Sequence, residues 1–363
     1  MTPHDTRCDI FCRVVDNFGD IGVTWRLARQ LASEHQMKVR LFVDDLASFQ
    51  KIEPAVVRAM ATQTISGVNI SGWDAATAPP ASLVIEAFGV NLPEPYVRAM
   101  AVCAPPPVWI NLEYLSAESW VATHHLLPSP HPQLPLCKYF FFPGFTKATG
   151  SLIRERDLIA SREAYQADNT EEALRILLFG YPNRAAANLL GAWERMPRGV
   201  RCLVPAGALA AQILMHASQL PQPSGKLAIV SSPFCSQADL DRLLWDEDVL
   251  FVRGEDSFVR AQWAAKPFVW QIYPQDAGAH WVKLEAFLAL YCRGLDDDAA
   301  RAVTALWHAW NAEDAGNIAA AWDAFARQLP ALQAHAKVWA NAMSAMPDLA
   351  ANLLSFYRKT AKI

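Results

Sequence analysis

Short hydrophobic runs alternate with longer amphipathic stretches along most of this chain. Runs rich in Val, Ile and Phe, without strict alternation of polar residues, are typical of parallel strands that helices cover on both faces. In the first half these runs lie at residues 9–16, 38–45, 82–89 and 108–115. A second series lies at residues 174–181, 199–205, 227–233, 249–253 and 267–273. The pattern therefore predicts two successive α/β units.

From about residue 280 onward the chain is rich in Ala and Leu at helical spacing, and no further strand pattern follows. Two Rossmann-like domains that face a cleft, with helices at the C-terminal end, match the GT-B architecture of glycosyltransferases. The same outline fits some epimerases and binding proteins, so the fold class does not select a function by itself.

The chain has 363 residues, which is more than one hydrophobic core usually serves. We predict an N-terminal Rossmann-like domain at residues 1–170 and a second domain at residues 171–344. The last helix, at about residues 345–363, is expected to pack back on the first domain.

Composition and charge narrow the classes of function. Hydrophobic residues make up 52% of the chain and charged residues 19%, with a formal net charge of -4. We find no concentrated Lys/Arg face, which argues against a nucleic-acid partner. No apolar run approaches about 18 residues, the usual length of a membrane span, and the N-terminus lacks the pattern of a signal peptide. We therefore expect a cytoplasmic protein with no membrane partner.

Residues 14–22 (VVDNFGDIG) join the first predicted strand to a helix, where ligands gather in α/β folds. A dinucleotide-binding turn carries G-x-G-x-x-G, whereas this turn carries Asp16 and Asp20, whose carboxylates would repel a pyrophosphate. A nicotinamide cofactor is therefore disfavoured. For each aspartate alone, a structural role in an N-cap or an Asx-turn fits about as well as a functional role. The two together, around a glycine turn, favour a general base.

A second strand, turn and helix are predicted at residues 249–265, with Gly254 at the turn. The N-terminus of such a helix binds phosphate through unpaired backbone N–H groups, and Ser257 can add a hydroxyl. Glu255 can accept hydrogen bonds from vicinal hydroxyls of a sugar or a ribose. The alternative is a structural cap formed by Asp256 or Ser257.

Further aromatic and polar residues close other predicted strands of the second half. They are Tyr181 in RILLFGY, Phe234 and Gln237 in SSPFCSQ, and Gln271 in FVWQIY. Rings and amide groups of this kind suit a planar nucleotide base. Singly, each aromatic residue also fits core packing, so the interpretation depends on their coincidence at strand ends.

Two acidic pairs, Asp246/Asp248 and Asp296/Asp298, have a spacing that could hold a cation. We expect the first in a solvated loop and the second at a helix start, which are structural positions for acids. The cysteines show no C-x-x-C spacing, so zinc is not indicated either. We therefore expect no metal site.

The segments RVVDNFGDIGVTWRLARQLA and VRGEDSFVRAQWAAKPFVWQIYPQ resemble the EarP family, the protein-arginine rhamnosyltransferases. The resemblance covers essentially the whole chain. It implies a GT-B fold, dTDP-β-L-rhamnose as the donor substrate and an arginine of elongation factor P as the acceptor. It also implies inversion at the anomeric carbon, with no cofactor. The first domain would then be the acceptor side and the second would bind the nucleotide sugar.

The resemblance also implies roles for individual residues. The residues implied as catalytic are Asp20 and Asp16. Those implied to bind the donor are Glu255, Asp256, Ser257, Tyr181, Phe234 and Gln237. Possible contacts with either substrate are Asn17, Phe18, Gly19 and Gln271.

These residue types suit arginine chemistry. A guanidinium is protonated at neutral pH and is a poor nucleophile, so paired carboxylates would orient it and accept a proton. We choose Asp20 as the base and Asp16 as the positioning group, although the two roles could be exchanged. Two alternatives remain: another GT-B nucleotide-sugar enzyme, such as an epimerase or a transferase to another acceptor, and a noncatalytic nucleotide-sugar-binding protein.

Overall fold

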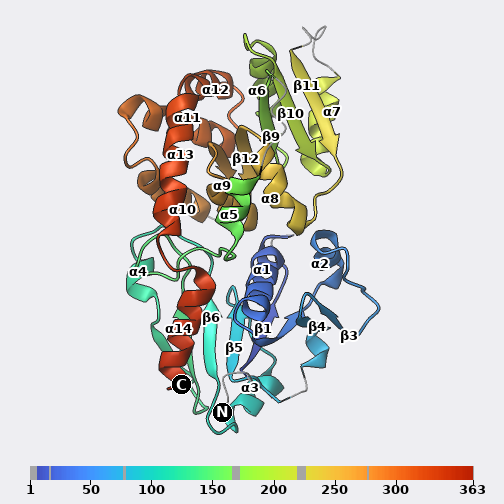
Figure 1. Cartoon of the computed structure of the whole chain (residues 1–363), viewed down its shortest axis with the longest axis vertical. Coiled ribbons are helices and arrows are strands. Elements are labelled where there is room, and N and C mark those ends of the chain that lie inside the picture. The colour runs from blue at the N-terminus through green and yellow to red at the C-terminus, as the bar shows by residue number, and fades with distance from the viewer. Residues whose placement is uncertain are drawn as a thin grey trace. The chain divides into compact units, whose positions relative to one another are not determined.

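The computed structural model describes residues 6–15, 18–76, 79–165, 172–218, 226–275 and 278–362. The chain forms two compact units (Figure 1). Unit 1 comprises Met1–Arg156 and Met343–Ile363, and unit 2 comprises Asp157–Ala342. Among the described helices, none combines the length and the apolar character that a membrane span requires.

The described part of unit 1 contains a sheet of eight strands in the order β3-β4-β2-β1-β5-β6-β8-β7. Its strands are β1 (Arg7–Cys12), β2 (Lys38–Val43), β3 (Thr62–Ile65), β4 (Val68–Gly72), β5 (Leu83–Ala87), β6 (Val108–Leu112), β7 (Pro128–Pro130) and β8 (Cys137–Phe141). Strands β4, β2, β1, β5, β6 and β8 are parallel, while β3 and β7 pair antiparallel at the two edges. Its helices are α1 (Gly19–Ser33), α2 (Leu46–Ile52), η1 (Trp73–Ala75), α3 (Glu94–Ala101), α4 (Val121–His124) and α14 (Leu349–Ala361).

The central strands of unit 1 are buried along almost their whole length, as the hydrophobic runs predict. The ring of Phe11 on β1 stacks on Phe42 with centroids 4.6 Å apart, and Tyr96 of α3 lies 4.8 Å away. A carboxylate is buried beside them: Asp9 on β1 accepts both arms of the Arg40 guanidinium at 2.6 Å. A bidentate pair of this kind satisfies a buried charge.

Helix α14 belongs to unit 1, although unit 2 separates it in sequence from the rest of that unit. Asp348, its N-cap, accepts a hydrogen bond from Gln30 of α1 at 3.2 Å. The hydroxyl of Tyr357 lies 3.0 Å from that of Ser82, just before β5. The end of the chain is therefore part of the core of unit 1.

The described part of unit 2 contains a parallel sheet of five strands in the order β11-β10-β9-β12-β13. Its strands are β9 (Leu174–Leu178), β10 (Val200–Pro205), β11 (Leu227–Ser232), β12 (Val249–Arg253) and β13 (Phe268–Gln271). Its helices are α5 (Leu158–Ala164), α6 (Ala186–Glu194), α7 (Ala208–Ala217), α8 (Gln237–Asp246), α9 (Asp256–Ala264), α10 (Ala279–Tyr291), α11 (Asp297–Asn311), α12 (Ile318–Arg327) and α13 (Leu329–Ser344).

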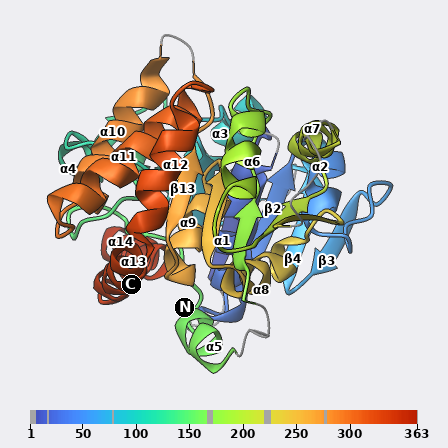
Figure 2. The same cartoon turned by 90° about the horizontal axis from the view of Figure 1, so that it is seen from above.

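The C-terminal helices of unit 2 form the helical region that the sequence predicts from about residue 280. Helices α11 and α12 lie side by side, and α11 packs against β13 (Figure 2). Aromatic rings fill the space between these helices and the sheet: Trp307 of α11 lies 5.4 Å from Phe268 on β13 and 5.7 Å from Phe287 of α10. Unit 2 therefore has a core of its own.

Candidate functional site

Asp20 lies in the first turn of α1, directly after β1. Helix α1 begins at Gly19, and Phe18 is its N-cap. The Asp20 side chain is buried, and its carboxylate accepts the backbone N–H of Val15 at 2.8 Å and the hydroxyl of Tyr114 at 3.0 Å. The interpretation of Asp20 as an N-cap is therefore wrong, because the residue lies inside the helix. Asp16 and Asn17 lie outside the described residues.

The partner of Asp20, Tyr114, follows the carboxyl end of β6. Its ring stacks on Phe88 with centroids 4.5 Å apart. Phe88 has a φ of +62°, which is rare for a bulky residue, and Gly89 follows it with a φ of +69°. The side chain of Asn111 accepts the Gly89 N–H at 3.0 Å and so supports this turn. Strained backbone held in this way is common at functional sites.

The predicted donor-binding turn joins β12 to α9 in unit 2. Gly254 has a φ of +59°, which permits the sharp reversal after β12. Its carbonyl accepts Trp270 Nε1 at 2.7 Å, and its N–H donates to the carbonyl of Gln271 at 3.3 Å. Glu255 is the N-cap residue of α9, and among the described residues its side chain makes no capping hydrogen bond. Hydrogen bonds to the neighbouring strand β13 therefore hold this turn in place.

Ser257 and Asp256 lie within α9, so the interpretation of either residue as its N-cap is wrong. The Ser257 hydroxyl is buried, donates to the carbonyl of Arg253 and accepts the Arg253 N–H at 3.1 Å. It therefore ties the first turn of α9 to the end of β12. Asp256 accepts a hydrogen bond from Gln237 Nε2 at 3.1 Å.

Gln237 is the first residue of α8 and is buried, whereas Phe234 is half-buried in the segment between β11 and α8. The hydrogen bond from Gln237 to Asp256 brings the N-terminal ends of α8 and α9 together. Both helices follow strands of the same parallel sheet. Their first turns therefore lie at its carboxyl edge.

Tyr181 and Gln271 meet at the same edge. The backbone N–H of Tyr181 donates to Gln271 Oε1 at 2.8 Å. A Cβ at Gly180 would lie 2.6 Å from that oxygen, so a larger residue there would force the Gln271 amide to move. The ring of Tyr273 packs against Tyr181 with centroids 5.6 Å apart.

Arg253, at the end of β12, adds a cation that the sequence interpretation missed. Its guanidinium carbon lies 4.6 Å from the ring centroid of Tyr181 and 4.9 Å from that of Phe179. The signal was the position itself, because Arg253 directly precedes the predicted phosphate-binding turn. The carboxyl edge of this sheet thus brings together an arginine, aromatic rings, amide groups and a helix N-terminus, which are groups that bind nucleotides.

The acidic pairs considered for a metal have structural partners. Asp296 is the N-cap of α11 and accepts the Ala299 N–H at 2.8 Å, as the sequence predicts. The prediction of a solvated loop for Asp246 and Asp248 is wrong. Asp246 accepts the hydroxyl of Tyr165 at 2.8 Å, Asp248 accepts the Arg175 N–H at 3.0 Å, and the intervening residue is buried. Within the described ranges, no group of three His, Cys, Asp or Glu side chains could hold a metal ion.

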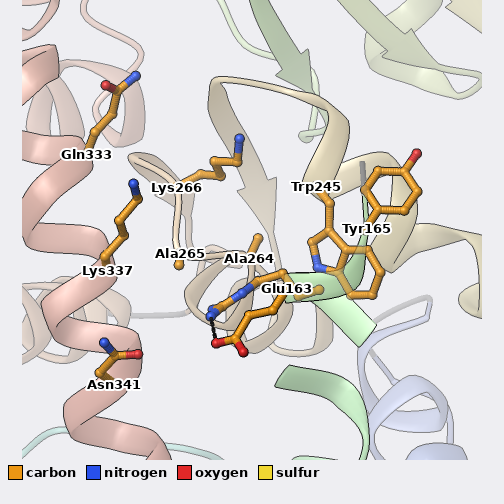
Figure 3. Close-up of a pocket in the computed structure, with 10 residues that line it drawn as sticks. Glu163, Tyr165, Trp245, Ala264, Ala265, Lys266, Gln333, Lys337 and Asn341 are labelled. Carbon is orange, nitrogen blue, oxygen red and sulfur yellow. Dashed lines mark hydrogen bonds and ion pairs between the residues drawn. The ribbon is translucent and has the colours of Figure 1, made fainter. Parts of the chain in front are cut away.

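A separate cavity of about 600 Å³ lies elsewhere in unit 2 (Figure 3). Gln333 and Lys337 of α13 lie on one side of it, and Trp245 and Tyr165 on the other. Lys266, between them, precedes β13, so the cavity is at the amino edge of the sheet. It is therefore distinct from the candidate donor-binding residues. Burial lowers the pKa of Lys266, against the opposing effect of the Asp248 carboxylate.

Comparison with known proteins decides the family. The model of the family described as "Elongation-Factor P (EF-P) rhamnosyltransferase EarP" matches residues 8–358. The chain belongs to the EarP family. A protein-arginine rhamnosyltransferase of Pseudomonas putida is 48% identical to this EarP-family chain, over 97% of the chain and 98% of that protein.

Solved structures agree with this assignment. The structure described as the basis for EarP-mediated arginine glycosylation of translation elongation factor EF-P is 36% identical. It matches with a TM-score of 0.67 over 98% of this chain and 99% of that chain. MurG of Acinetobacter baumannii, at 13% identity, matches with a TM-score of 0.53 over 98% of this chain and 99% of its own, which shows the fold alone. The EarP-family chain therefore has the GT-B fold and is a glycosyltransferase, and both predictions are confirmed.

Proposed function

We propose that this protein transfers L-rhamnose from dTDP-β-L-rhamnose to an arginine side chain of elongation factor P, with inversion at the anomeric carbon. The observation that carries the proposal is the match to the EarP family over residues 8–358. It supports a protein acceptor and a nucleotide-sugar donor. The proposal includes catalysis without a metal or a cofactor, in the cytoplasm.

On the acceptor side, we assign Asp20 as the general base. Its carboxylate is buried and is held by Val15 and Tyr114, so its direction is set before an arginine arrives. A fixed carboxylate can bind a guanidinium by charge-assisted hydrogen bonds and accept its proton as the N-glycosidic bond forms. Asp16 would position the acceptor, with Asn17, Phe18 and Gly19 as further contacts.

On the donor side, the groups at the carboxyl edge of the unit 2 sheet suit a nucleoside diphosphate. The N-terminal turn of α9 and the guanidinium of Arg253 supply positive charge where the leaving diphosphate gains negative charge. Tyr181 and Phe234 would contact the base, while Glu255 would accept hydrogen bonds from sugar or ribose hydroxyls. Gln237, Asp256, Ser257 and Gln271 shape the surface around them. This source of positive charge supports the proposal of metal independence.

The experiment that tests the function is intact-mass analysis of purified elongation factor P after incubation with this protein and dTDP-L-rhamnose. Parallel samples contain EDTA, or the Asp20→Asn variant in place of the wild type. We expect the mass of one deoxyhexose to be added by the wild type, with and without EDTA, and not by the variant. An unmodified acceptor, with calorimetry still showing that dTDP binds, would leave a nucleotide-sugar protein with a different acceptor or none.

A further inference from the structure

Two side-chain contacts connect α8 to α9, one helical turn apart. The first joins Gln237 to Asp256 at the N-terminal ends of the helices, with 3.1 Å between Nε2 and Oδ2. The second joins Asp241 to Arg260, four residues further along each helix. Residues four apart lie on the same face of a helix. The two contacts therefore lie one above the other along the seam where α8 packs against α9.

The Asp241–Arg260 contact has the geometry of a fixed joint. Arg260 Nε and Nη2 donate to the two oxygens of Asp241, both at 2.6 Å. The Arg260 side chain is 0% exposed and that of Asp241 is 16% exposed. A planar guanidinium that meets a carboxylate with both arms fixes the angle between the two groups as well as their separation.

A contribution to the stability of the fold does not explain well why this ion pair is present. Burying two charges costs free energy that their attraction often fails to recover, and apolar residues of similar volume can replace such pairs without loss of stability. What apolar residues cannot reproduce is the defined geometry of a bidentate contact. The pair is therefore suited to fixing the register of α8 against α9.

That register matters for the candidate donor site. Gln237 begins α8 and Asp256 begins α9, so any sliding or rotation of the helices would change the relative positions of these two side chains. The first turn of α9 is tied to the end of β12 through Ser257. Helix α8 is connected to its own strand, β11, by a short loop. The Asp241–Arg260 contact joins the two helices one turn below the carboxyl edge of the sheet. It therefore couples the end of β11 to the end of β12.

We propose that Asp241 and Arg260 are positioning residues for donor binding, which hold Gln237 and Asp256 in the register that accommodates the nucleoside diphosphate. This inference rests on the proposed function, because it requires unit 2 to bind the donor. The pair acts through the helices and does not itself contact substrate.

The decisive variant is Asp241→Leu combined with Arg260→Met, which replaces the ion pair by apolar side chains. We expect its thermal midpoint to stay near that of the wild type, while the Kd for dTDP and the KM for the sugar nucleotide rise roughly 10-fold to 100-fold. The KM for elongation factor P should not change. A folded double variant that binds dTDP like the wild type would overturn the inference.

A single variant covers the case in which the double variant fails to fold. Arg260→Lys keeps the positive charge but cannot make the bidentate contact with Asp241, so its Kd for dTDP should also rise. Its matched control is Arg40→Lys, which removes the equivalent bidentate contact with Asp9 in unit 1. The control should leave the Kd for dTDP within about twofold of the wild type. A wild-type Kd in Arg260→Lys, or an equal rise in Arg40→Lys, would contradict a positioning role.

Wild-type dTDP binding and the mass shift of elongation factor P are measured first. If the wild type neither binds dTDP nor modifies the acceptor, the proposed function fails and the inference fails with it. If the wild type does both and the variants equal it in donor binding, only the inference fails.

Discussion

Asp20 combines burial with hydrogen bonds that fix the direction of its carboxylate. The backbone of Val15 donates to one oxygen and the hydroxyl of Tyr114 to the other. Tyr114 is in turn held by the ring of Phe88. A general base oriented by its surroundings needs little rearrangement when the substrate binds.

Replacing Asp20 with asparagine should separate catalysis from donor binding. The amide keeps the shape of the side chain but cannot accept the proton, so the kcat for transfer should fall by at least about 100-fold. The Kd for dTDP should stay within about twofold, because the proposed donor residues belong to unit 2. Calorimetry and mass spectrometry measure the two quantities. A proportional loss of both would refute the assignment.

Glu247 should make the stability of unit 2 depend on pH. Burial raises its pKa from 4.5 to about 7, against the opposing effect of Arg201, whose Nη1 lies 3.2 Å from Oε1. Because the folded pKa lies above the unfolded value, the stability that this group contributes is complete below pH 4.5. It is lost as the pH rises through about 7.

The matching variant is Glu247→Gln, which cannot titrate. It should remove up to about 3 kcal/mol of the fall in unfolding free energy between acidic and weakly alkaline pH. Urea unfolding of both proteins at pH values of about 5 and 8 tests this. If the two proteins lose stability in parallel over that range, Glu247 is not the titrating group.

At the scale of elements, the turn between β12 and α9 carries most of the proposed donor chemistry. Neighbouring groups hold it: the Trp270 indole, the Gln271 carbonyl and the Ser257 hydroxyl. The turn therefore keeps its shape without a side-chain cap from Glu255.

Replacing Glu255 with alanine should accordingly weaken donor binding and leave folding nearly intact. Loss of a hydrogen bond to a charged group predicts a Kd for dTDP-L-rhamnose roughly 10-fold higher. The unfolding free energy should change by about 0.5 kcal/mol or less. Calorimetry and thermal unfolding test the two parts. A large loss of stability would show that the residue serves the fold and not the ligand.

The predicted strands match the central strands of the unit 1 sheet and all five strands of the unit 2 sheet. Central strands are the easiest to predict, because burial on both faces leaves a continuous hydrophobic run in the sequence. The two outer strands on each side of the unit 1 sheet were missed, namely β3 and β4 on one side and β8 and β7 on the other, with β3 and β7 at the edges. Strand β3 reads TQTI and β7 reads PSP, so neither carries that pattern. Strands at an edge need less hydrophobic sequence, and their pairing depends on the rest of the sheet.

The candidate site could be predicted only in part for a similar reason. Local patterns located the turns that contain Asp20 and Glu255, since each turn lies between a strand and a helix. Tyr114 is 94 positions from Asp20, and Gln271 is 90 positions from Tyr181. Contacts over such separations are set by the order of strands in the sheet, which hydrophobic periodicity does not encode. The functional roles of these residues stay predictions.

At the scale of the whole molecule, each unit has its own core, and that of unit 1 requires helix α14. Leu349, Leu353 and Leu354 of this helix are buried. Their burial removes apolar surface from water, and unit 1 loses that contribution if the helix is disrupted.

A destabilising substitution in α14 should therefore lower the stability of unit 1 and leave that of unit 2 unchanged. Leu353→Ala should lower the unfolding free energy of unit 1 by about 2 to 5 kcal/mol. Hydrogen exchange should become faster in unit 1, while dTDP binding at permissive temperature is retained. Equal acceleration of exchange in both units would show that the two cores unfold as one.

The split of unit 1 around unit 2 also has a consequence for synthesis on the ribosome. Residues 157–342 of unit 2 are continuous and are synthesised before helix α14 of unit 1. Unit 2 can therefore begin to fold before α14 is available, whereas unit 1 exposes the surface that α14 covers until that helix has emerged. The part that is made first is thus the last to finish folding, and in that interval it is the part of the nascent chain most exposed to chaperones.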